Sequence, residues 1–407
     1  MSHSHKIVFL EPTWRGQTHA QINASMINII RGSFPKIPAK LLAEEEHISV
    51  VEKYLNPLQP ILKEEIKISN VFYGKTGLFL WRRMFREGVN LVTAISSRPK
   101  EKVHLVLLSA NSTALAIAKL LAKFWPKKLI VQAVMHGNLN EINGWQTKHP
   151  IKRQFGMARV LSRTLPKNMR LILSEEGIYR SLVEKFPHLA ASCDVIPHPL
   201  CMQEMQTPSL DVHPATPLPR PIRFGLVGQA TQAKGFPTFI EVAKQIAVTH
   251  PLRAEFCLAG MFTPQEDPSL VRLLSRDTNP NGLSRDEFTR MMASLHYVIL
   301  PLGESYYKFS PSGALVDAMT FGKPIIATKT PTTEDLFNRF PGIGYLCNDG
   351  DHILSVTKEI LDKFSWGVYL KQVSAVMEAR KERTQKSLSR KYAQLILKRF
   401  PDFVATR

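Results

Sequence analysis

The stretch from Tyr297 to Thr328 constrains the fold of this chain more than any other segment. Its pattern predicts a buried strand from Val298 to Leu302, a polar loop, a helix, a Gly-Lys-Pro turn and a second apolar strand. A strand, helix and strand in this order form a parallel unit with a right-handed crossover. Helices cover both faces of a parallel sheet, so we expect an open α/β architecture.

The same alternation of apolar runs and helical periodicity continues through the rest of the chain, and it predicts two doubly wound domains. The strands that we expect elsewhere are Lys6 to Leu10, Val103 to Ser109, Leu129 to Met135, Arg170 to Leu173 and Ile222 to Val227. Residues 201–221 are rich in proline and lack apolar periodicity, which indicates an extended linker. We therefore place an N-terminal domain at 1–200 and a C-terminal domain at 222–367.

Polar residues follow two strands of the C-terminal domain where ligands of open α/β sheets bind. After the strand at 298–302, Ser310, Ser312 and Gly313 stand at a helix start, where free backbone N–H groups and the helix dipole favour a phosphate. Asp317, one turn further, offers a carboxylate to sugar hydroxyls. These residues predict a site for the phosphates and ribose of a nucleotide.

A second turn of the same kind follows the strand at 222–227, where Gly228 precedes Lys234 and Gly235. Lysine at such a place meets phosphate. The segment is neither a Walker motif nor a dinucleotide fingerprint. By itself it is compatible with an ordinary strand-to-helix turn and a solvated lysine, but together the two turns favour a nucleotide site.

The segments VGQATQAKGF and SPSGALVDAMTFGKPIIAT resemble the C-terminal domain of GT-B glycosyltransferases of the family-4 type, the glycosyl transferases group 1. The resemblance implies two Rossmann-like domains whose parallel sheets face an interdomain cleft, and a last helical segment, 368–407, that crosses back to the N-domain. It assigns Lys234 to the donor diphosphate, Ser312 and Gly313 to the phosphates, and Asp317 to the ribose.

Two positions depart from the family pattern. Gln229 stands where an arginine usually precedes the lysine, and the paired-glutamate motif has Phe309 at its first position and Asp317 at its second. Glu304 is the nearest carboxylate that could substitute for the first glutamate, although a glutamate at a strand end is more often merely solvated. The donor site is therefore expected to persist while details of the sugar site differ.

The resemblance also implies the activity. We expect a hexosyl-type transferase that moves a sugar from a nucleotide-diphosphate donor to a glycan or polyprenyl- or lipid-linked acceptor in bacterial polysaccharide or lipopolysaccharide assembly, with retention of configuration and with no cofactor or dedicated metal. Two alternatives stay open. One is a GT-B-like nucleotide-sugar epimerase. The other is a catalytically weak scaffold homologue in a glycan-assembly complex, which Gln229 and Phe309 motivate.

In the N-terminal half, His136 follows the strand at 129–135 and is the preferred catalytic candidate on the acceptor side. Glu11 and the loop from Gly16 to His19 follow the first strand and are further candidates for acid–base and acceptor contacts. Each has a structural alternative, since His136 could cap its strand and Glu11 or His19 could serve a helix start.

Charge is uneven along the sequence. Residues 1–200 carry 28 Lys and Arg against 14 Asp and Glu, net +14, whereas residues 201–407 carry 25 against 20, net +5. No nucleic-acid module accompanies the positive charge, so we expect an anionic membrane surface rather than nucleic acid as a partner. The segment Phe79 to Arg86 mixes aromatic and basic residues and predicts an interfacial helix, with a surface helix that buries its apolar face as the alternative.

The four cysteines, Cys193, Cys201, Cys257 and Cys347, show neither disulfide nor zinc spacing. No apolar run reaches the roughly eighteen residues of a membrane span, and no signal core is present. We expect a cytoplasmic protein, peripheral at the inner face of the membrane. The triplet Asp349-Gly350-Asp351 predicts a turn with Asp351 as helix cap rather than a metal site.

Overall fold

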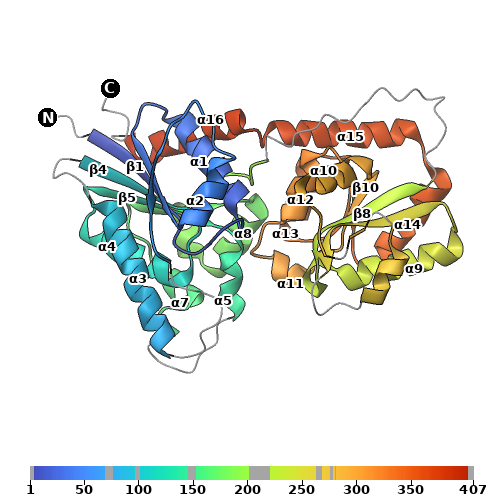
Figure 1. Ribbon diagram of the computed structural model, residues 1–407, viewed down its shortest axis with the longest axis horizontal. Helices are drawn as coiled ribbons and strands as arrows, with labels where there is room; N and C mark the ends of the chain where they lie inside the picture. Colours follow the sequence, from blue (N-terminus) through green and yellow to red (C-terminus); the bar gives the residue numbers. More distant parts are fainter. Residues whose placement is uncertain are drawn as a thin grey trace. The chain divides into compact units, whose positions relative to one another are not determined.

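The computed structural model describes residues 4–68, 77–96, 101–144, 153–200, 221–262, 268–275, 278–279 and 281–401. The chain divides into two compact units (Figure 1). Unit 1 comprises residues 1–199, 309–311 and 385–407, and unit 2 comprises residues 200–308 and 312–384. The predicted linker, 201–221, lies outside the described residues except for Pro221.

Unit 1 is built on a seven-stranded parallel sheet with the strand order β3-β2-β1-β4-β5-β6-β7. Its elements are β1 (Ser4–Leu10), α1 (Ala20–Ser33), β2 (Ala39–Ala43), α2 (Glu45–Glu52), β3 (Leu62–Glu65), α3 (Gly77–Ile95), β4 (Glu101–Leu107), α4 (Ser112–Phe124), β5 (Leu129–Met135), η1 (Gly137–Asn140), α5 (Glu141–Gly144), α7 (Met157–Leu161), β6 (Met169–Leu173), α8 (Glu176–Lys185), η2 (Pro187–Ser192), β7 (Cys193–Val195) and α16 (Gln385–Arg399).

Unit 2 is built on a five-stranded parallel sheet with the strand order β12-β11-β10-β8-β9. Its elements are β8 (Ile222–Ala230), η4 (Gln232–Lys234), α9 (Phe236–Thr249), β9 (Ala254–Phe262), η5 (Pro268–Leu273), α10 (Arg285–Ser294), β10 (Tyr297–Leu300), α11 (Glu304–Tyr307), α12 (Gly313–Thr320), β11 (Ile325–Thr328), α13 (Pro331–Arg339), β12 (Gly344–Cys347), α14 (Gly350–Lys363) and α15 (Trp366–Lys381).

The predicted fold class is confirmed, because both sheets are parallel and each is covered by helices on both faces. The reason is the composition of the strands. In β5, for example, all but one of the residues are buried, so neither face of the strand can meet water. Two hydrophobic clusters flank each sheet; in unit 1, α3 and α4 contribute to one cluster and α1, α2 and α16 to the other.

Local sequence fixes where the helices begin. Asn111 caps α4, because its side-chain oxygen accepts hydrogen bonds from the N–H groups of Thr113 and Ala114, at 3.0 and 2.9 Å. Ser284 and Glu287 form a capping box that starts α10. These caps set the first residue of each helix.

One boundary prediction was wrong. Asp349, rather than Asp351, caps α14, since its carboxylate accepts a hydrogen bond from the N–H of His352 at 2.8 Å. Gly350 is therefore the first helical residue and not a separate turn. The C-terminal helical segment contains two helices, α15 and α16, separated at residues 382–384.

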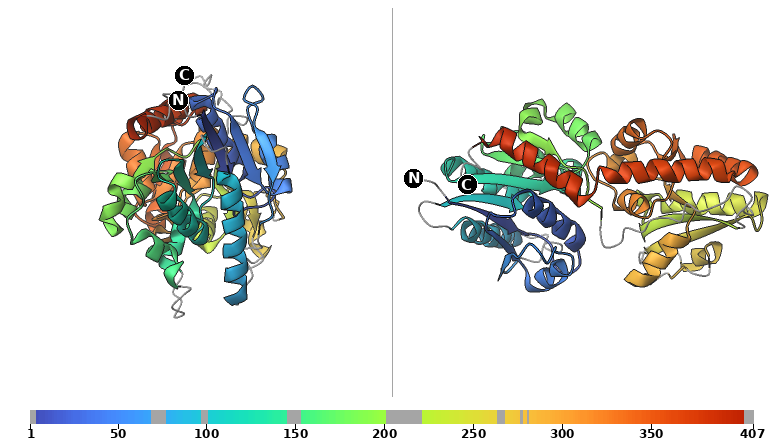
Figure 2. Two further views of the ribbon diagram at one scale, coloured as in Figure 1. Left: turned by 90° about the vertical axis from the view of Figure 1, so that its left-hand side faces the viewer. Right: turned by 90° about the horizontal axis from the view of Figure 1, so that it is seen from above.

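The last helix, α16, covers the strands of unit 1 although it comes from the far end of the sequence (Figure 2). Ser33 donates a hydrogen bond to the carbonyl of Ser389 at 2.7 Å, and Ser389 donates to the carbonyl of Ile29 at 2.9 Å. Tyr392 is fully buried and donates to the side-chain oxygen of Gln132 on β5. Polar contacts thus fix the register of this helix on α1 and on the sheet.

Cysteines contribute to the cores and not to crosslinks in the described residues. Cys193, Cys257 and Cys347 are buried and free, and burial raises the pKa of Cys193 to about 12. Cys201 lies outside the described residues. Buried thiols of this kind act as small apolar side chains.

We predict that Tyr392→Phe lowers the free energy of unfolding of unit 1 by about 1 kcal/mol, because the ring is kept while its hydrogen bond to Gln132 is lost. Urea denaturation followed by circular dichroism measures the change. Tyr306→Phe, at a tyrosine that is 45% exposed, is the matched control and is expected to change stability by less than about 0.5 kcal/mol. Equal effects of the two substitutions would contradict the prediction.

Candidate functional site

In unit 2, the turn between β8 and α9 packs backbone against backbone on the loop after β10. Gly235 has a φ of +72°, and a Cβ added to it would overlap the carbonyl oxygen of Pro301. The N–H of Gly303 donates a hydrogen bond to the carbonyl of Ala233 at 3.2 Å. Only glycine allows this approach, and it brings the carboxyl ends of two neighbouring strands together.

Lys234 lies in this turn with its ammonium group folded over Gly228. A Cβ on Gly228, whose φ is +88°, would lie 2.5 Å from Lys234 Nζ. Among the described residues, no hydrogen bond or ion pair engages this Nζ. Burial lowers the pKa of Lys234, and the nearby Asp317 opposes that shift. The sequence-predicted Gly228, Lys234 and Asp317 therefore do form one group, and it holds a cation poor in protein partners.

Asp317 lies in the second turn of α12. Burial raises the pKa of its carboxyl to about 6, while Arg285 and Lys234 oppose the rise. Arg285, the first residue of α10, was missed from the sequence, although the Ser284–Glu287 capping signal could have placed a helix start at this edge. The Arg285 guanidinium also lies over the ring of Phe288, 4.8 Å from its centroid. Two cations therefore surround this carboxylate.

Two residues at the start of α12, Ser312 and Gly313, have different roles. Ser312 caps the helix, because its hydroxyl accepts a hydrogen bond from the N–H of Leu315 at 3.2 Å. Gly313 is exposed, and a Cβ added there would meet no atom within 4 Å. The backbone at Gly313 is therefore open to a ligand, whereas the Ser312 hydroxyl is already engaged.

The other residues predicted for the donor site, Ser310 and Glu304, do not contact Lys234 among the described contacts. The segment 309–311 groups with unit 1, where Ser310 is buried and Phe309, 1% exposed, lies in the hydrophobic core. Glu304 is exposed and is the first residue of the short helix α11. Neither Ser310 nor Glu304 makes a described contact with Lys234.

In unit 1, Glu11 is fully buried at the end of β1 and holds the loop that follows it. Its carboxylate accepts hydrogen bonds from the N–H groups of Thr13 and Trp14, at 2.8 and 3.0 Å, and from the side-chain amide of Asn23 at 2.7 Å. Burial raises the pKa of Glu11 to about 7 despite these bonds. Its oxygens are occupied by the loop, so the structure gives it a positioning role.

The same network fixes Gly16. The Nδ1 of His47 lies 2.8 Å from the Gly16 carbonyl, and its Nε2 lies 3.0 Å from the Asn23 side chain. Gly16 itself has a φ of +50°, which suits glycine. The sequence analysis did not identify Asn23 or His47. The available signal was a polar residue inside an apolar helical pattern at each of these two positions.

His19 and His136 meet at the carboxyl edge of this sheet, with ring centroids 5.3 Å apart. His19 has a φ of 60° and stacks on Trp14 at 4.6 Å. Burial, together with His198 and His47, lowers the pKa of His19 to about 4. Burial, together with His19 and His198, holds the pKa of His136 well below its ordinary value.

His136 is therefore a neutral imidazole at neutral pH. It is 2% exposed, and neither ring nitrogen makes a hydrogen bond of good geometry among the described residues. The backbone of Leu108 lies near enough to oppose the fall of its pKa. A buried polar group without a partner is uncommon and is typical of functional sites. Such an imidazole can accept a proton or a hydrogen bond from a hydroxyl group.

Comparisons with known proteins agree with this geometry. The family model of the glycosyl transferases group 1 matches residues 221–362, which include Lys234, Ser312, Gly313 and Asp317. Residues 221–362 therefore form a domain of the glycosyl transferases group 1 type. A search of curated protein sequences finds no significant match.

Solved structures of glycosyltransferases show that the fold of this chain is GT-B. A glycosyltransferase of Rickettsia africae matches with a TM-score of 0.66 at 12% identity, over 97% of this chain and 98% of that one. HepE of Anabaena, solved with UDP and glucose, matches with a TM-score of 0.65 at 14% identity, over 97% and 99%. WaaG, a glycosyltransferase involved in lipopolysaccharide biosynthesis, matches with a TM-score of 0.62 at 12% identity, over 96% and 99%.

No metal centre is evident in the part of the chain that the structure describes, since no three His, Cys, Asp or Glu side chains gather with suitable spacing. The candidate residues are instead cations and backbone N–H groups in unit 2 and neutral imidazoles in unit 1. The first set suits an anionic ligand and the second suits a hydroxyl group.

We predict that Gly228→Ala destabilises unit 2 by about 1–3 kcal/mol, because the added Cβ enforces a strained backbone and displaces the Lys234 ammonium. Gly313→Ala is the matched control at the same site, because its Cβ enters open space, and it should change stability by less than about 0.5 kcal/mol. Thermal unfolding of the two variants without ligand measures the difference. Equal stability of both variants would contradict the strained turn.

We predict that the stability of unit 1 falls as the pH drops below about 6.5, and that His136→Asn makes this fall shallower. An unfolded histidine takes up a proton near that pH, whereas His136 in the folded state stays neutral to a lower pH. The slope should therefore decrease by up to about 1.4 kcal/mol per pH unit. Urea denaturation of both proteins between about pH 5 and pH 7 measures how the free energy of unfolding depends on pH. An equal dependence in wild type and variant would refute the buried neutral state of His136.

Proposed function

We propose that this chain transfers a sugar from a nucleotide-diphosphate donor to a glycan or a lipid-linked acceptor. One observation carries the proposal, namely the ammonium of Lys234, which is held over Gly228 beside Asp317 without a hydrogen-bond or ion-pair partner among the described residues. Removing a cation from water is costly unless a counter-charge accompanies it. A bound diphosphate supplies that charge.

The donor would use several groups of unit 2. Lys234 and the open backbone at Gly313 stabilise the negative charge that grows on the diphosphate as it leaves. Asp317 accepts hydrogen bonds from the ribose hydroxyls. The UDP and UDP-glucose complexes of HepE, which has the same fold, support a nucleotide sugar as the donor class.

On the acceptor side we assign the main role to His136, whose two ring nitrogens make no hydrogen bond of good geometry among the described residues. As a neutral imidazole it can receive a hydrogen bond from a sugar or acceptor hydroxyl. Glu11 acts indirectly by holding the loop that carries Trp14, on which His19 stacks. Lipopolysaccharide biosynthesis is the process in which WaaG is involved, and WaaB is an outer-core galactosyltransferase, which makes assembly of a bacterial surface glycan the favoured setting.

Retention of anomeric configuration is part of the proposal. Phe309 stands where the resemblance expects the first glutamate, so this position supplies no carboxylate. Its side chain lies in a hydrophobic core. A path in which the leaving phosphate itself accepts the acceptor's proton needs no protein nucleophile. This path is compatible with an apolar residue at position 309.

A catalytically weak scaffold is the second candidate, favoured by the same Phe309 and by the exposed Gln229. Arg285 counts against it, because this arginine places a second cation near Asp317 although Gln229 has replaced the usual one. A scaffold that had lost donor binding would have no reason to keep two cations around one carboxylate.

We predict that UDP-sugar turnover falls by about 100-fold or more in Lys234→Met, because a charge that stabilises the leaving diphosphate is lost. A thermal-shift panel of UDP, GDP, CMP and dTDP with their common sugars identifies the donor first. Asp317→Ala should lose the nucleotide-selective shift as well. Lys244→Met, at an exposed lysine of α9, is the matched control and should retain both shift and turnover.

Failure to detect a shift with any of these nucleotides at high concentration would count against the transferase and favour the scaffold. Binding without turnover, with either a glycan or a lipid-linked acceptor, would also favour the scaffold.

A further inference from the structure

Helix α3 exposes a row of large apolar side chains, and its buried side carries the polar Glu87 and Asn90 beside Leu91 and Ala94. An ordinary surface helix has a buried side that is mainly apolar. Four large apolar side chains are exposed by 44 to 75%: Trp81, Phe85, Val89 and Val92. Successive helical residues turn by about 100°, so these four occupy about a quarter of the circumference. Within the predicted interfacial segment, Trp81 and Phe85 are exposed, so these two side chains do not lie in the core.

The opposite side of α3 is fixed to the domain by polar contacts. Glu87 is 3% exposed and accepts hydrogen bonds from the side chains of Asn111, at 2.8 Å, and Thr113. Arg83 donates to the same carboxylate at 2.8 Å. Asn90 is also buried and donates to the carbonyl of Lys67 at 3.0 Å. These bonds prevent the helix from rotating to hide its apolar side.

Helix α4 continues the exposed surface. Its inner residues pack with those of α3 in one core cluster on the same face of the sheet, so the outer sides of both helices face away from that sheet. On α4 and directly after it, Leu120, Phe124 and Trp125 are exposed by 54%, 72% and 44%. We call the exposed apolar residues of both helices the α3–α4 outer face.

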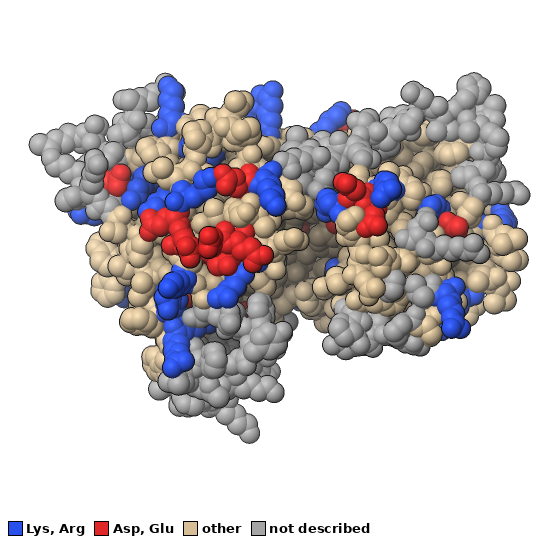
Figure 3. Space-filling model, in the orientation of Figure 1, with Lys and Arg blue, Asp and Glu red and all other residues tan. Residues whose placement is uncertain are grey.

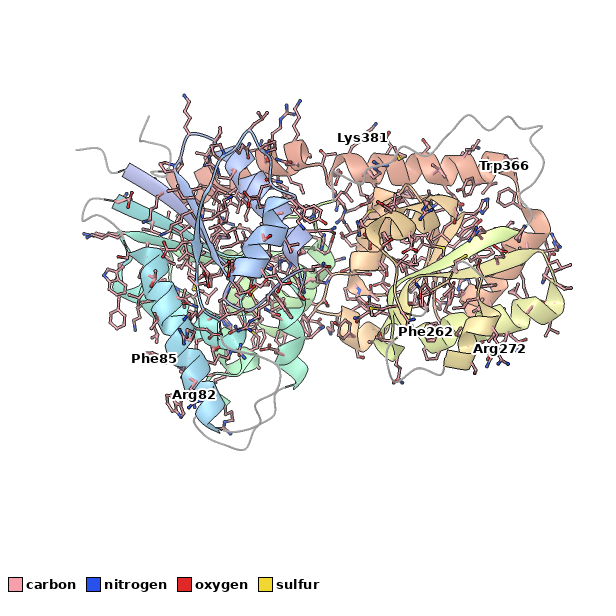
Figure 4. The ribbon with its side chains drawn as sticks, in the orientation of Figure 1. Arg82, Phe85, Phe262, Arg272, Trp366 and Lys381 are labelled. Atoms are coloured by element: carbon pink, nitrogen blue, oxygen red, sulfur yellow. The ribbon has the colours of Figure 1, made fainter. Side chains whose placement is uncertain are left out.

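The charges around this outer face are positive. Arg82 and Arg86 are exposed on α3, and Lys123, Lys127 and Lys128 are exposed at the end of α4 and after it. Arg82 and Phe85 point outward from α3 (Figure 4). The acidic side chains of α2 and β3 gather on a separate part of unit 1 (Figure 3), and α2 packs on the other face of the sheet.

We propose that the α3–α4 outer face docks unit 1 on an anionic lipid bilayer. Aromatic and aliphatic side chains insert at the interface while arginine and lysine meet the lipid phosphates. A second copy of this chain is disfavoured, because a symmetric contact through this face would bring two surfaces of the same positive charge together. Among the described residues, no helix combines the length and apolar content that a membrane crossing needs.

This docking adds a membrane surface to the proposed function. It rests on that function only where a lipid is taken to carry the acceptor. The middle of α3 lies near the carboxyl edge of the unit 1 sheet, because Glu87 is bonded to Asn111 and Thr113, which follow β4. The carboxyl edge of this sheet also carries His136. A head group carried by a lipid in the bilayer would therefore reach the acceptor-side residues from the docked face.

The test uses the full chain and flotation with phosphatidylcholine vesicles, with and without phosphatidylglycerol. Trp81→Ser combined with Phe85→Ser is expected to lower partitioning onto the anionic vesicles by about tenfold or more. Arg82→Ser combined with Arg86→Ser should lower it by about fivefold for each arginine, and high salt should reduce wild-type binding similarly. Leu58→Ser combined with Leu62→Ser removes two leucines of unit 1 that are 87% and 72% exposed, and this control should bind like wild type.

A second measurement does not depend on the stability of these variants. Trp81→Phe keeps an apolar side chain, and it should remove part of the fluorescence that a lipid-borne quencher reaches in the wild type. No wild-type binding to either vesicle, or binding that neither pair of substitutions weakens, overturns the docking. A wild-type dimer that Trp81→Ser with Phe85→Ser converts to a monomer, without vesicle binding, overturns it in favour of a second copy.

The nucleotide-dependent thermal shift separates this inference from the proposed function. If the variants with weakened vesicle binding keep the nucleotide-dependent thermal shift, their donor site is intact. Vesicle binding without any nucleotide shift would leave the docking in place and remove the transferase. Nucleotide shifts without vesicle binding would do the reverse.

Discussion

The close approach of backbones around the turn after β8 is the constraint on which the donor side depends. A Cβ on Gly260 would overlap the carbonyl of Gly228, and a Cβ on Gly235 would overlap that of Pro301. Three neighbouring strand ends can meet only because these positions lack side chains. That packing presses the Lys234 ammonium into a place with little water, where an anion gains more than it would at an exposed lysine.

Burial has different electrostatic effects at the candidate sites of the two units. In unit 2, cations and a carboxylate are kept together, and burial moves the pKa of Lys234 down and that of Asp317 up. In unit 1, burial holds His19 and His136 neutral while Glu11 is shared between loop N–H groups and Asn23. One unit is thereby suited to hold charge and the other to handle a hydroxyl group without adding charge.

Sequence periodicity predicted the fold class and most of the strands, because buried parallel strands are usually continuous apolar runs. It also pointed to Gly228, Lys234 and Asp317, since turns at strand ends have local signatures. It could not find Asn23, His47 or Arg285, whose importance comes from contacts between distant segments. Nor could it tell which side of α3 faces the core, because that depends on the partners Asn111 and Thr113 offer to Glu87.

The position of α16 has a consequence for how the protein is made. Unit 1 contains the first strands to leave the ribosome, yet one face of its sheet is covered by a helix that is synthesised after all of unit 2. Until then, apolar residues of α1 such as Ile30 lack the cover of Tyr392 and Ile396. The earlier half of the chain must therefore wait, partly uncovered, while the later half folds, and it is during this interval that aggregation or chaperone binding is favoured.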